Sequence, residues 1–317
     1  MIIDVHHHML PLTYDEPAID KEVQRRHILY GQGARSERID LPVEEIKRRV
    51  AECAPDPNGE KLIRRMNKAG IDITFLCVVD NVETGADDAA CLINNRTCAE
   101  IALKSGGRIM ALAGVDPRRK AAPQLYRRCV KEYGMKGLKW HPDNGYYPNS
   151  KEAYVLLAVA EELGTPLLTH TGPLPAAPGS SLLPRARYAD PALLDEVALD
   201  FPGLKIIAAH MGRFQWRKWA EIAQFRRNLY GDLAMWQIFA VTNYERFCRD
   251  LRDILDIAGP DSVLFGSDGT GFTVLVPNEE FIRILRDLPR KAPAGIKFTD
   301  NEIKNILGNN AEKVFGL

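Results

Sequence analysis

The sequence predicts an α/β protein in which residues 1–317 form a single (β/α)8 TIM barrel. Three observations lead to this prediction. Eight short apolar runs recur along the chain, amphipathic helical patterns separate most of them, and histidines collect at the ends of the runs. Strands that alternate with helices favour a parallel sheet, and eight such units favour closure of that sheet into a barrel. Barrels of this kind commonly reach about 250 residues or more as one domain.

The apolar runs have the length of buried strands and are bounded by turn-forming residues. They cover residues 2–8, 71–79, 108–115, 135–141, 166–170, 204–209, 228–233 and 262–267. None of them leads into a Gly-x-Gly-x-x-Gly pattern, which argues against a dinucleotide-binding open sheet. The runs are therefore expected to be the eight strands of the barrel.

Helices are predicted between the strands by apolar residues spaced three and four apart, as in residues 126–133. Asp190 followed by Pro191 is typical of a helix start. Glycines mark the expected helix ends at Gly70, Gly134 and Gly164. Residues 301–317 are expected to form a terminal helix that docks through four apolar side chains, Ile303, Ile306, Leu307 and Val314.

The first connection is too long for a single helix, because about 60 residues separate the first two predicted strands. Residues 9–42 are therefore interpreted as an insertion at the barrel mouth. The insertion is polar and rich in arginine between Arg25 and Arg38, so it either covers an anionic substrate or forms a solvated surface excursion.

Composition limits the classes of partner. Lys plus Arg and Asp plus Glu each total 42, so no net charge draws the chain to nucleic acid or to an anionic membrane. The first residues show no basic stretch followed by a long apolar run, no segment approaches about 18 uninterrupted apolar residues, and the six cysteines form no Cys-x-x-Cys pair. We expect a cytoplasmic protein with a small-molecule substrate, free thiols and no membrane segment; the sequence leaves a homo-oligomer open.

Six of the seven histidines stand at the carboxyl ends of predicted strands, where barrel enzymes assemble their active sites. These are His6, His7, His8, His141, His170 and His210. Strand alternation predicts that Asp4, His6 and His8 face one side and that residues 3, 5 and 7 face the other. His6 and His8 can therefore bind one metal ion, whereas His7 faces the helices and satisfies backbone groups.

Three more residues are expected to join this site. His170 and His210 each end a buried strand that runs into a glycine-containing turn, and Asp268 ends the eighth strand. Because the last strand of a barrel closes beside the first, Asp268 should lie near His6 and His8.

Five short motifs occur in a defined order along the whole chain. They are Asp4-Val-His6-His-His8, Gly137-Leu-Lys139-Trp-His141-Pro142, Thr169-His170-Thr-Gly, Ala209-His210-Met-Gly and Gly266-Ser-Asp268. Together they resemble the amidohydrolase superfamily, and most closely its amidohydrolase-related (family 2) branch. That branch includes α-amino-β-carboxymuconate-semialdehyde decarboxylase, related decarboxylases and many uncharacterised metal-dependent hydrolases. The segment from Ile306 to Ala311 resembles the terminal helix of the same branch.

The resemblance implies a site. Its metal ligands would be His6, His8, His170 and Asp268, and its catalytic residues His210 and Asp268. Lys139 stands near the place of a carbamylated lysine in two-metal members. Because His141 follows on the same face, Lys139 and His141 are instead expected to bind an anionic substrate. One divalent ion is favoured, zinc before manganese, and a second ion stays open.

The leading functional hypothesis is a metal-dependent hydrolase that uses a metal-activated water on a small amide, lactone or ester. Asp268 would take the proton of the water, and His210 would stabilise the oxyanion or carry the proton to the leaving group. The alternative is a nonoxidative decarboxylase or hydratase that acts on an unsaturated or aromatic carboxylic acid. A barrel that binds metal without catalysis is the third hypothesis.

Overall fold

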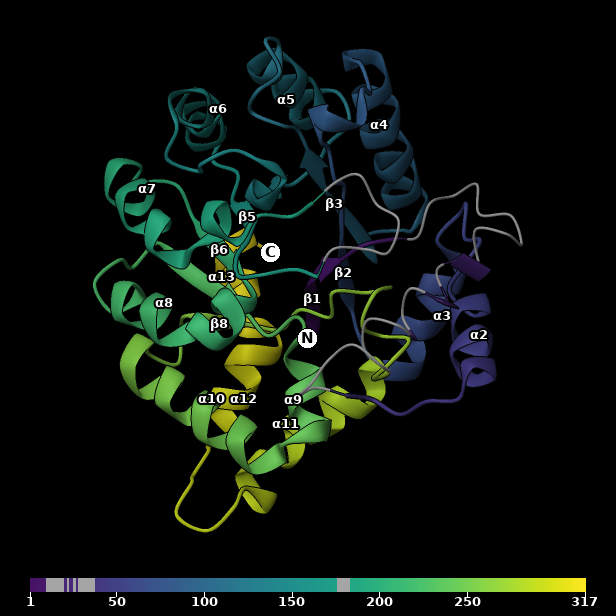
Figure 1. Cartoon of the computed structure of the whole chain (residues 1–317), viewed down its shortest axis with the longest axis vertical. Helices are drawn as coiled ribbons and strands as arrows, with labels where there is room; N and C mark the ends of the chain where they lie inside the picture. Colours follow the sequence, from purple (N-terminus) through teal and green to yellow (C-terminus); the bar gives the residue numbers. More distant parts are fainter. Residues whose placement is uncertain (10–19, 22, 25–26, 28–37, 176–182) are drawn as a thin grey trace.

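A computed structural model describes residues 1–9, 20, 21, 23, 24, 27, 38–175 and 183–317. Its eight parallel strands follow one another around a sheet in sequence order, and helices surround them (Figure 1). The strands are β1 Ile3–His7, β2 Ile73–Cys77, β3 Ile109–Gly114, β4 Leu138–Trp140, β5 Leu167–His170, β6 Ile206–Ala209, β7 Leu229–Asp232 and β8 Val263–Leu264. Each lies within one of the apolar runs, so the predicted (β/α)8 barrel is confirmed.

The first and last strands close the barrel. The backbone N–H of Val5 donates to the carbonyl of Phe265 over 3.0 Å, and His7 forms an isolated parallel bridge with Gly269. The regular ladder of β8 ends at Leu264, several residues before this bridge. The segment that carries Asp268 is consequently attached to β1 by individual hydrogen bonds and not by a continuous ladder.

The helices form the outer layer, and two of them, α2 and α3, precede β2. The helices are α2 Val43–Ala51, α3 Glu60–Ala69, α4 Asp88–Lys104, α5 Ala122–Lys131, α6 Lys151–Glu162, α7 Leu194–Asp200, α8 Trp216–Ala223, α9 Trp236–Thr242, α10 Tyr244–Ala258, α11 Asn278–Lys291, α12 Asp300–Lys304 and α13 Asn310–Phe315. Gly70 ends α3, and Gly134 and Gly164 adopt left-handed backbone angles after α5 and α6, as their positions predict. The Asp190 side chain caps a short 3-10 turn, Pro191–Leu193, that leads into α7.

Two apolar cores stabilise the barrel. One fills its interior with inward side chains that include Val5, Phe75, Leu168 and Ile207, and the other lies between the strands and the helices. The predicted docking face of the terminal helix is confirmed, because all four of its apolar side chains are buried. After α12 a π-helical turn, Asn305–Asn309, leads into α13. Phe315 stacks on Phe75 with ring centroids 3.9 Å apart, so the chain end closes the barrel opposite its mouth.

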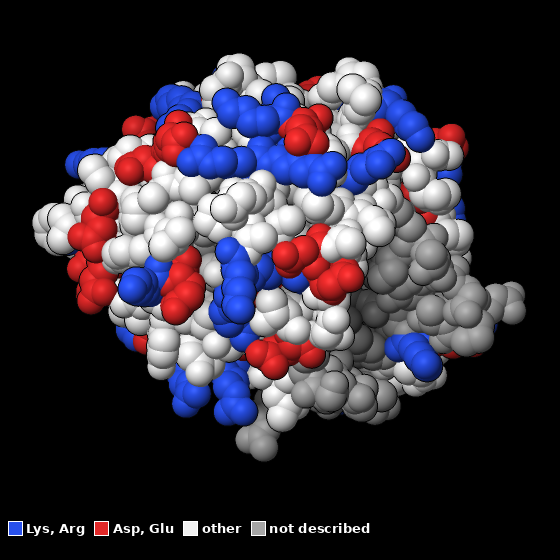
Figure 2. All heavy atoms as spheres, turned by 90° about the horizontal axis from the view of Figure 1, so that it is seen from above, with Lys and Arg blue, Asp and Glu red and all other residues white. Residues whose placement is uncertain are grey.

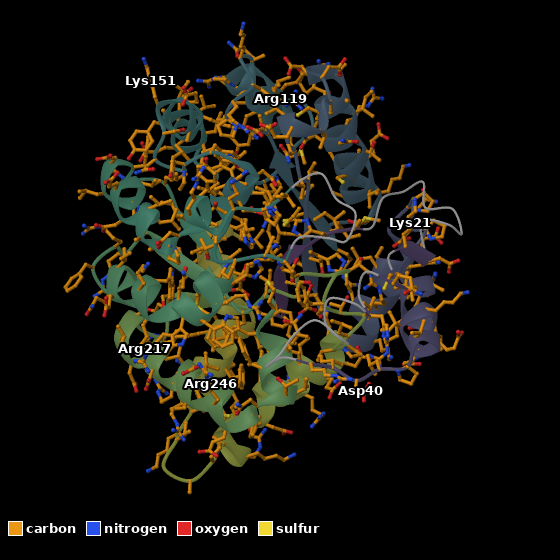
Figure 3. The ribbon with its side chains drawn as sticks, in the orientation of Figure 1. Lys21, Asp40, Arg119, Lys151, Arg217 and Arg246 are labelled. Atoms are coloured by element: carbon orange, nitrogen blue, oxygen red, sulfur yellow. The ribbon has the colours of Figure 1, made fainter. Side chains whose placement is uncertain are left out.

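The predicted insertion at 9–42 lies largely outside the described residues, and so do three of its arginines, Arg25, Arg26 and Arg35. Within the part of the chain that the structure describes, no helix combines the length and apolar character needed to cross a bilayer. Charged side chains such as Lys151 and Arg217 lie at the rim of the molecule, away from the barrel axis (Figure 3). The polar residues at the strand ends, by contrast, lie at the barrel mouth.

Candidate metal centre and active site

The carboxyl ends of the strands bring the predicted histidines into one cluster. Neighbouring imidazole centroids are 5.0 Å apart for His6 and His8, 5.2 Å for His6 and His210, and 5.0 Å for His170 and His210. His141 continues the ring of side chains, 5.7 Å from His8 and stacked on His170 at 5.2 Å. Residues that are more than 200 positions apart in sequence thus line one site, as barrel geometry requires.

Simple alternation along β1 is wrong at one point. The pairing of β1 with β2 shifts register between Asp4 and His7, which marks a β-bulge. Ile3 and Val5 consequently point into the barrel core, and Asp4 lies on the side of His7, with 3.6 Å between its Oδ2 and His7 Nδ1. His6 and His8 still converge, and His7 faces outward as predicted, although it contacts the Ser267 side chain.

His6 and His8 are oriented as metal ligands. Nδ1 of His6 lies 3.0 Å from Asp232 Oδ2, and Nδ1 of His8 lies 3.1 Å from the Cys77 carbonyl. Because both partners are acceptors, Nδ1 carries the proton in each ring and each Nε2 presents a lone pair, which on His6 contacts Lys139 Nζ at 2.9 Å. These two Nε2 atoms are 3.0 Å apart. Two unprotonated nitrogens cannot hydrogen-bond to each other, so this pair is suited to share a cation.

Asp268 supplies the third donor. Its Oδ1 lies 3.8 Å from Nε2 of His6 and 3.8 Å from Nε2 of His8, and its Oδ2 lies 4.0 Å from Nε2 of His210. A metal ion at about 2.0–2.2 Å from each of three ligand atoms needs those atoms roughly 3–4 Å apart. The two imidazoles and this carboxylate therefore fit a divalent ion.

His170 lies in the same wall but is less closely aligned. Its Nε2 contacts the Gly172 carbonyl at 3.0 Å, and its buried Nδ1 has no hydrogen-bond partner among the described residues. An orphaned buried nitrogen on a ring that adjoins His210 is suited to a fourth ligand.

Two other compact donor groups exist among the described residues, His6 with His8 and Cys77, and His6 with His210 and Asp232. Burial raises the pKa of the Cys77 thiol to about 12, which disfavours the thiolate that would bind a metal. Asp232 already accepts from His6 and from the backbone N–H groups of His210 and Ala234 at 2.8 and 3.1 Å. The group of His6, His8 and Asp268 is therefore the better candidate.

Burial keeps the imidazoles neutral. It lowers the pKa of His6, His8 and His210 well below the usual value, and nearby cationic groups, Lys139 among them, lower each one further. Burial also lowers the pKa of the Lys139 ammonium. Neutral rings with an available lone pair are the form that binds metal, so burial holds these imidazoles in the metal-binding form.

His210 occupies a strained turn. From His210 to Arg213 four successive residues have positive φ angles of 66°, 51°, 70° and 54°. The turn is held by the bond from His210 N to Asp232 and by the Trp236 indole, which donates to the His210 carbonyl over 3.0 Å. Nδ1 of His210 lies 3.0 Å from the Ala234 carbonyl, so its Nε2 lone pair faces Asp268. Backbone strain of this kind concentrates at functional sites.

Lys139 and His141 complete the site from β4 and its end. The Lys139 side chain is fully buried, and its Nζ lies 2.9 Å from Nε2 of His6. Nδ1 of His141 lies 3.3 Å from Asp143 Oδ1, whereas its buried Nε2 has no hydrogen-bond partner among the described residues. Both side chains thus border the candidate metal centre, as their shared strand face predicts.

The sequence motifs did not single out Asp232, which contacts His6 and holds the backbone of His210. Its position at the end of β7 was a usable signal, because the polar residues at other strand ends of this barrel belong to the site. The motifs also passed over Asp143, which adjoins His141, and gave no role to Ser267, which adjoins His7 and lies inside the motif Gly266-Ser-Asp268.

We expect Asp232→Asn to weaken metal binding by about 10- to 100-fold, because it removes the carboxylate that orients the His6 ring. Competition with a chromophoric chelator measures the change. Asp261→Asn is the matched control, since Asp261 is 74% exposed and remote from the site. Equal affinity in the Asp232 variant and the wild type would show that Asp232 does not orient His6.

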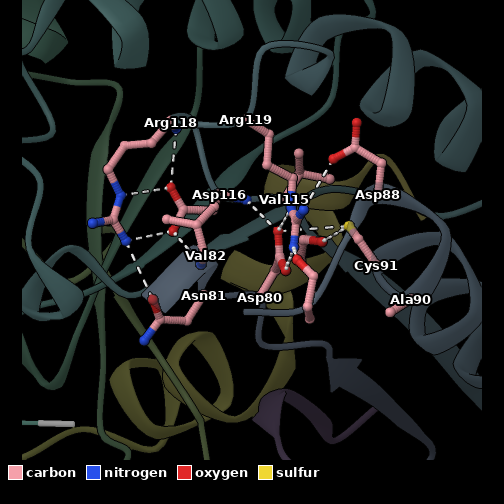
Figure 4. Close-up of polar contacts among 12 residues, drawn as sticks. Asp80, Asn81, Val82, Asp88, Ala90, Cys91, Val115, Asp116, Arg118 and Arg119 are labelled. Carbon is pink, nitrogen blue, oxygen red and sulfur yellow. Dashed lines mark hydrogen bonds and ion pairs between the residues drawn. The ribbon is translucent and has the colours of Figure 1, made fainter. Parts of the chain in front are cut away.

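The loops after β2 and β3 are fastened by a separate polar network (Figure 4). Arg119 donates to both oxygens of Asp80 at 2.7 and 2.8 Å and to Asp88 at 2.9 Å, and Arg118 donates to both oxygens of Asp116. These arginines are bound to protein carboxylates, so they stabilise the loops at the barrel mouth.

One face of the molecule carries Lys and Arg side chains next to Asp and Glu side chains (Figure 2).

The sequence model of the amidohydrolase family (Amidohydro_2, described as amidohydrolase) matches residues 3–317. No curated protein matches the sequence. The fold is similar to three solved structures, each over 100% of this chain. The first is 5-carboxyvanillate decarboxylase LigW from Sphingomonas paucimobilis, with 18% identity, 99% of that chain covered and a TM-score of 0.63. The second is a probable 2-pyrone-4,6-dicarboxylic acid hydrolase from Acinetobacter baumannii with citric acid bound, with 14% identity, 99% of that chain covered and a TM-score of 0.62. The third is a dihydroxybenzoic acid decarboxylase from Polaromonas with bound manganese and 2-nitroresorcinol, with 19% identity, 97% of that chain covered and a TM-score of 0.61.

Proposed function

Because the chain belongs to the amidohydrolase family, we propose that it is a metal-dependent enzyme that removes carbon dioxide, without oxidation, from a small unsaturated or aromatic carboxylic acid. The observation that carries this proposal is the fully buried Lys139 side chain, whose Nζ lies 2.9 Å from His6 Nε2 beside the candidate metal centre. Burial lowers the pKa of this amine, and an anion bound beside it would favour its charged form. We therefore infer that the substrate is an anion.

The similar structures favour decarboxylation over hydrolysis, although the chemistry of a metal-activated water placed hydrolysis first on the sequence alone. Two of the three are named as decarboxylases, of 5-carboxyvanillate and of dihydroxybenzoic acid, and the second of these contains manganese. Manganese consequently stands beside zinc as the expected metal. The third is named as a probable hydrolase of a dicarboxylic acid, so a carboxylic acid occurs in all three names.

A divalent ion held by His6, His8, His170 and Asp268 would fix the substrate anion and withdraw electron density from it. The chain's own groups do the rest. The His6 Nε2 lone pair cannot accept from Lys139 and bind a metal ion at the same time. With a metal ion on that nitrogen, the Lys139 Nζ would be available to bind the substrate anion. His141, with its unpartnered Nε2, lies on the same strand face and adds a second polar contact for the substrate.

Decarboxylation breaks the bond between carbon and carboxylate, releases carbon dioxide and leaves a carbon that takes one proton. Asp268 and His210 are the candidates to transfer that proton, because Oδ2 of Asp268 and Nε2 of His210 face each other at 4.0 Å. We assign Asp268 as the donor to carbon and His210 as the group that returns a proton to Asp268 from solvent. The lone pair on His210 Nε2 makes that ring an acceptor and not a donor toward an oxyanion.

Hydrolysis of an amide, lactone or ester is the second candidate. The same pair, Asp268 and His210, is suited to accept a proton from water at the candidate metal centre, and this geometry favours hydrolysis as much as proton delivery to carbon. The two reactions use the same residues and differ in the fate of solvent atoms.

The test is turnover of hydroxybenzoic and unsaturated carboxylic acids by enzyme reconstituted with manganese or zinc, in deuterium oxide and in oxygen-18 water. We expect carbon dioxide release, one solvent deuterium on carbon and no oxygen label in the product. The matching amides, esters and lactones serve as the comparison panel. Oxygen-18 in a new carboxylate or hydroxyl, without release of carbon dioxide, would establish hydrolysis in place of decarboxylation.

A further inference from the structure

We propose that Asp4, His7 and Ser267 form a positioning network behind the candidate metal centre, which holds the Asp268 carboxylate at metal-binding distance from His6 and His8. The inference rests on the proposed function because it assumes that the centre binds a metal ion. None of the three residues is expected to touch metal or substrate, and all three are fully buried.

Ser267 is the centre of the network. Its backbone N–H donates to Asp4 Oδ1 over 2.9 Å, and its hydroxyl donates to Asp4 Oδ2 over 2.6 Å. A serine hydroxyl has one hydrogen, so Oγ is an acceptor toward its other neighbours. The donor neighbours are His7 Nδ1 and the Gly269 backbone N–H, both at 3.1 Å, and the His6 carbonyl lies farther from Oγ, at 3.3 Å. The His7 ring therefore carries its proton on Nδ1 and is bound to Ser267.

The bulge in β1 makes this arrangement possible. It turns Asp4 and His7 to the outer side of the strand while His6 and His8 face inward. The outer pair binds Ser267, and the next residue, Asp268, faces the inner pair. The end of β1 and the segment after β8 thus contact each other on both faces. The distance of Asp268 from His6 and His8 therefore depends on the hydrogen bonds between Asp4, His7 and Ser267.

Asp268 needs such support, because the ladder of β8 ends at Leu264 and Asp268 has a left-handed φ of 46°. A residue other than glycine keeps this conformation only where its surroundings impose it. The Asp268 N–H donates to the His6 carbonyl over 2.8 Å on one side. On the other, the His7 ring packs so closely against Gly269 that an added Cβ atom there would clash with the ring.

The Gln237 and Thr270 side chains add two bonds to the same segment. Gln237 Nε2 donates to the Ser267 carbonyl over 2.6 Å, and Thr270 Oγ1 donates to the His8 carbonyl over 3.1 Å. The segment from Ser267 to Thr270 is thereby fixed by side chains in place of a ladder. Removing the serine hydroxyl deletes the contact that joins Asp4, His7 and Gly269.

The test measures metal affinity and not turnover alone. We expect Ser267→Ala to weaken manganese and zinc binding by about 10-fold or more, as loss of a group that orients a metal ligand does elsewhere. Asp4→Asn is expected to act in the same direction, because it removes the charge that accepts both Ser267 donors. Chelator competition gives the affinities, and the visible spectrum of the cobalt-substituted variant reports changed ligand geometry.

Thr74→Val is the matched control. Thr74 is a fully buried residue opposite Asp4 on β2, and its hydroxyl has no hydrogen-bond partner among the described residues. Its metal affinity should equal that of the wild type. If Ser267→Ala lowers the melting temperature of the metal-free protein but leaves affinity and cobalt spectrum unchanged, Ser267 is only structural and the inference is overturned. If the wild type itself binds no metal, both the proposed function and this inference fail.

Discussion

Replacing His6 and His8 together by alanine will abolish bound metal. The wild-type chain is expected to hold about one manganese or zinc ion, because two Nε2 lone pairs 3.0 Å apart and the Asp268 carboxylate form a compact donor set. The double variant keeps only Asp268 and His170 of the proposed ligands. Two ligands do not retain a divalent ion through gel filtration against a mild chelator. Elemental analysis after that step gives the metal content.

His27→Ala is the control for the loss of a histidine as such, since His27 stands apart from the strand ends in sequence. It should retain the wild-type metal content. Circular dichroism checks that the double variant is folded. Full metal content in a folded double variant would show that the ion lies elsewhere and would remove the basis for the proposed chemistry.

His210→Asn will lower the turnover rate by more than about 100-fold while the metal stays bound. The ring nitrogen Nε2 faces Asp268 Oδ2 at 4.0 Å, and Nδ1 is engaged by the Ala234 carbonyl, so this imidazole is placed to move a proton. The amide of asparagine can replace the contact with Ala234 but cannot carry a proton. Turnover and elemental analysis are measured on the same preparation.

Asp268→Asn, measured beside His210→Asn, distinguishes the residue that binds the metal from the residue that only transfers a proton. We expect it to lose both metal and activity, because Asp268 serves both functions in the proposed site. If His210→Asn loses its metal and Asp268→Asn retains it, the two residues have exchanged roles. His210 would then be a ligand through the alternative donor group that it forms with His6 and Asp232.

The strand order, the barrel and most of the candidate site are legible in the amino-acid sequence. Eight apolar runs lie where the eight strands lie, because the strands of a parallel barrel are buried on both faces and leave a continuous apolar signal. Histidines at strand ends are equally informative, since chain direction alone sends all carboxyl ends of a parallel sheet to one edge. The sequence was therefore sufficient to place together the site residues His6, His8, His170, His210 and Asp268.

The direction in which those side chains point depends on tertiary contacts. The bulge in β1 arises from pairing with β2, which no local pattern encodes, so alternation assigned Asp4 to the wrong side. Asp232 orients His6 from the end of β7, 226 positions along the chain, and Ser267 binds Asp4 across 263 positions. Such bonds form because closure of the barrel brings the first and last strands together. Periodicity reports which face of an element is buried, whereas the acceptors that fix the imidazole protons of His6, His8 and His210 come from other strands and the loops that follow them.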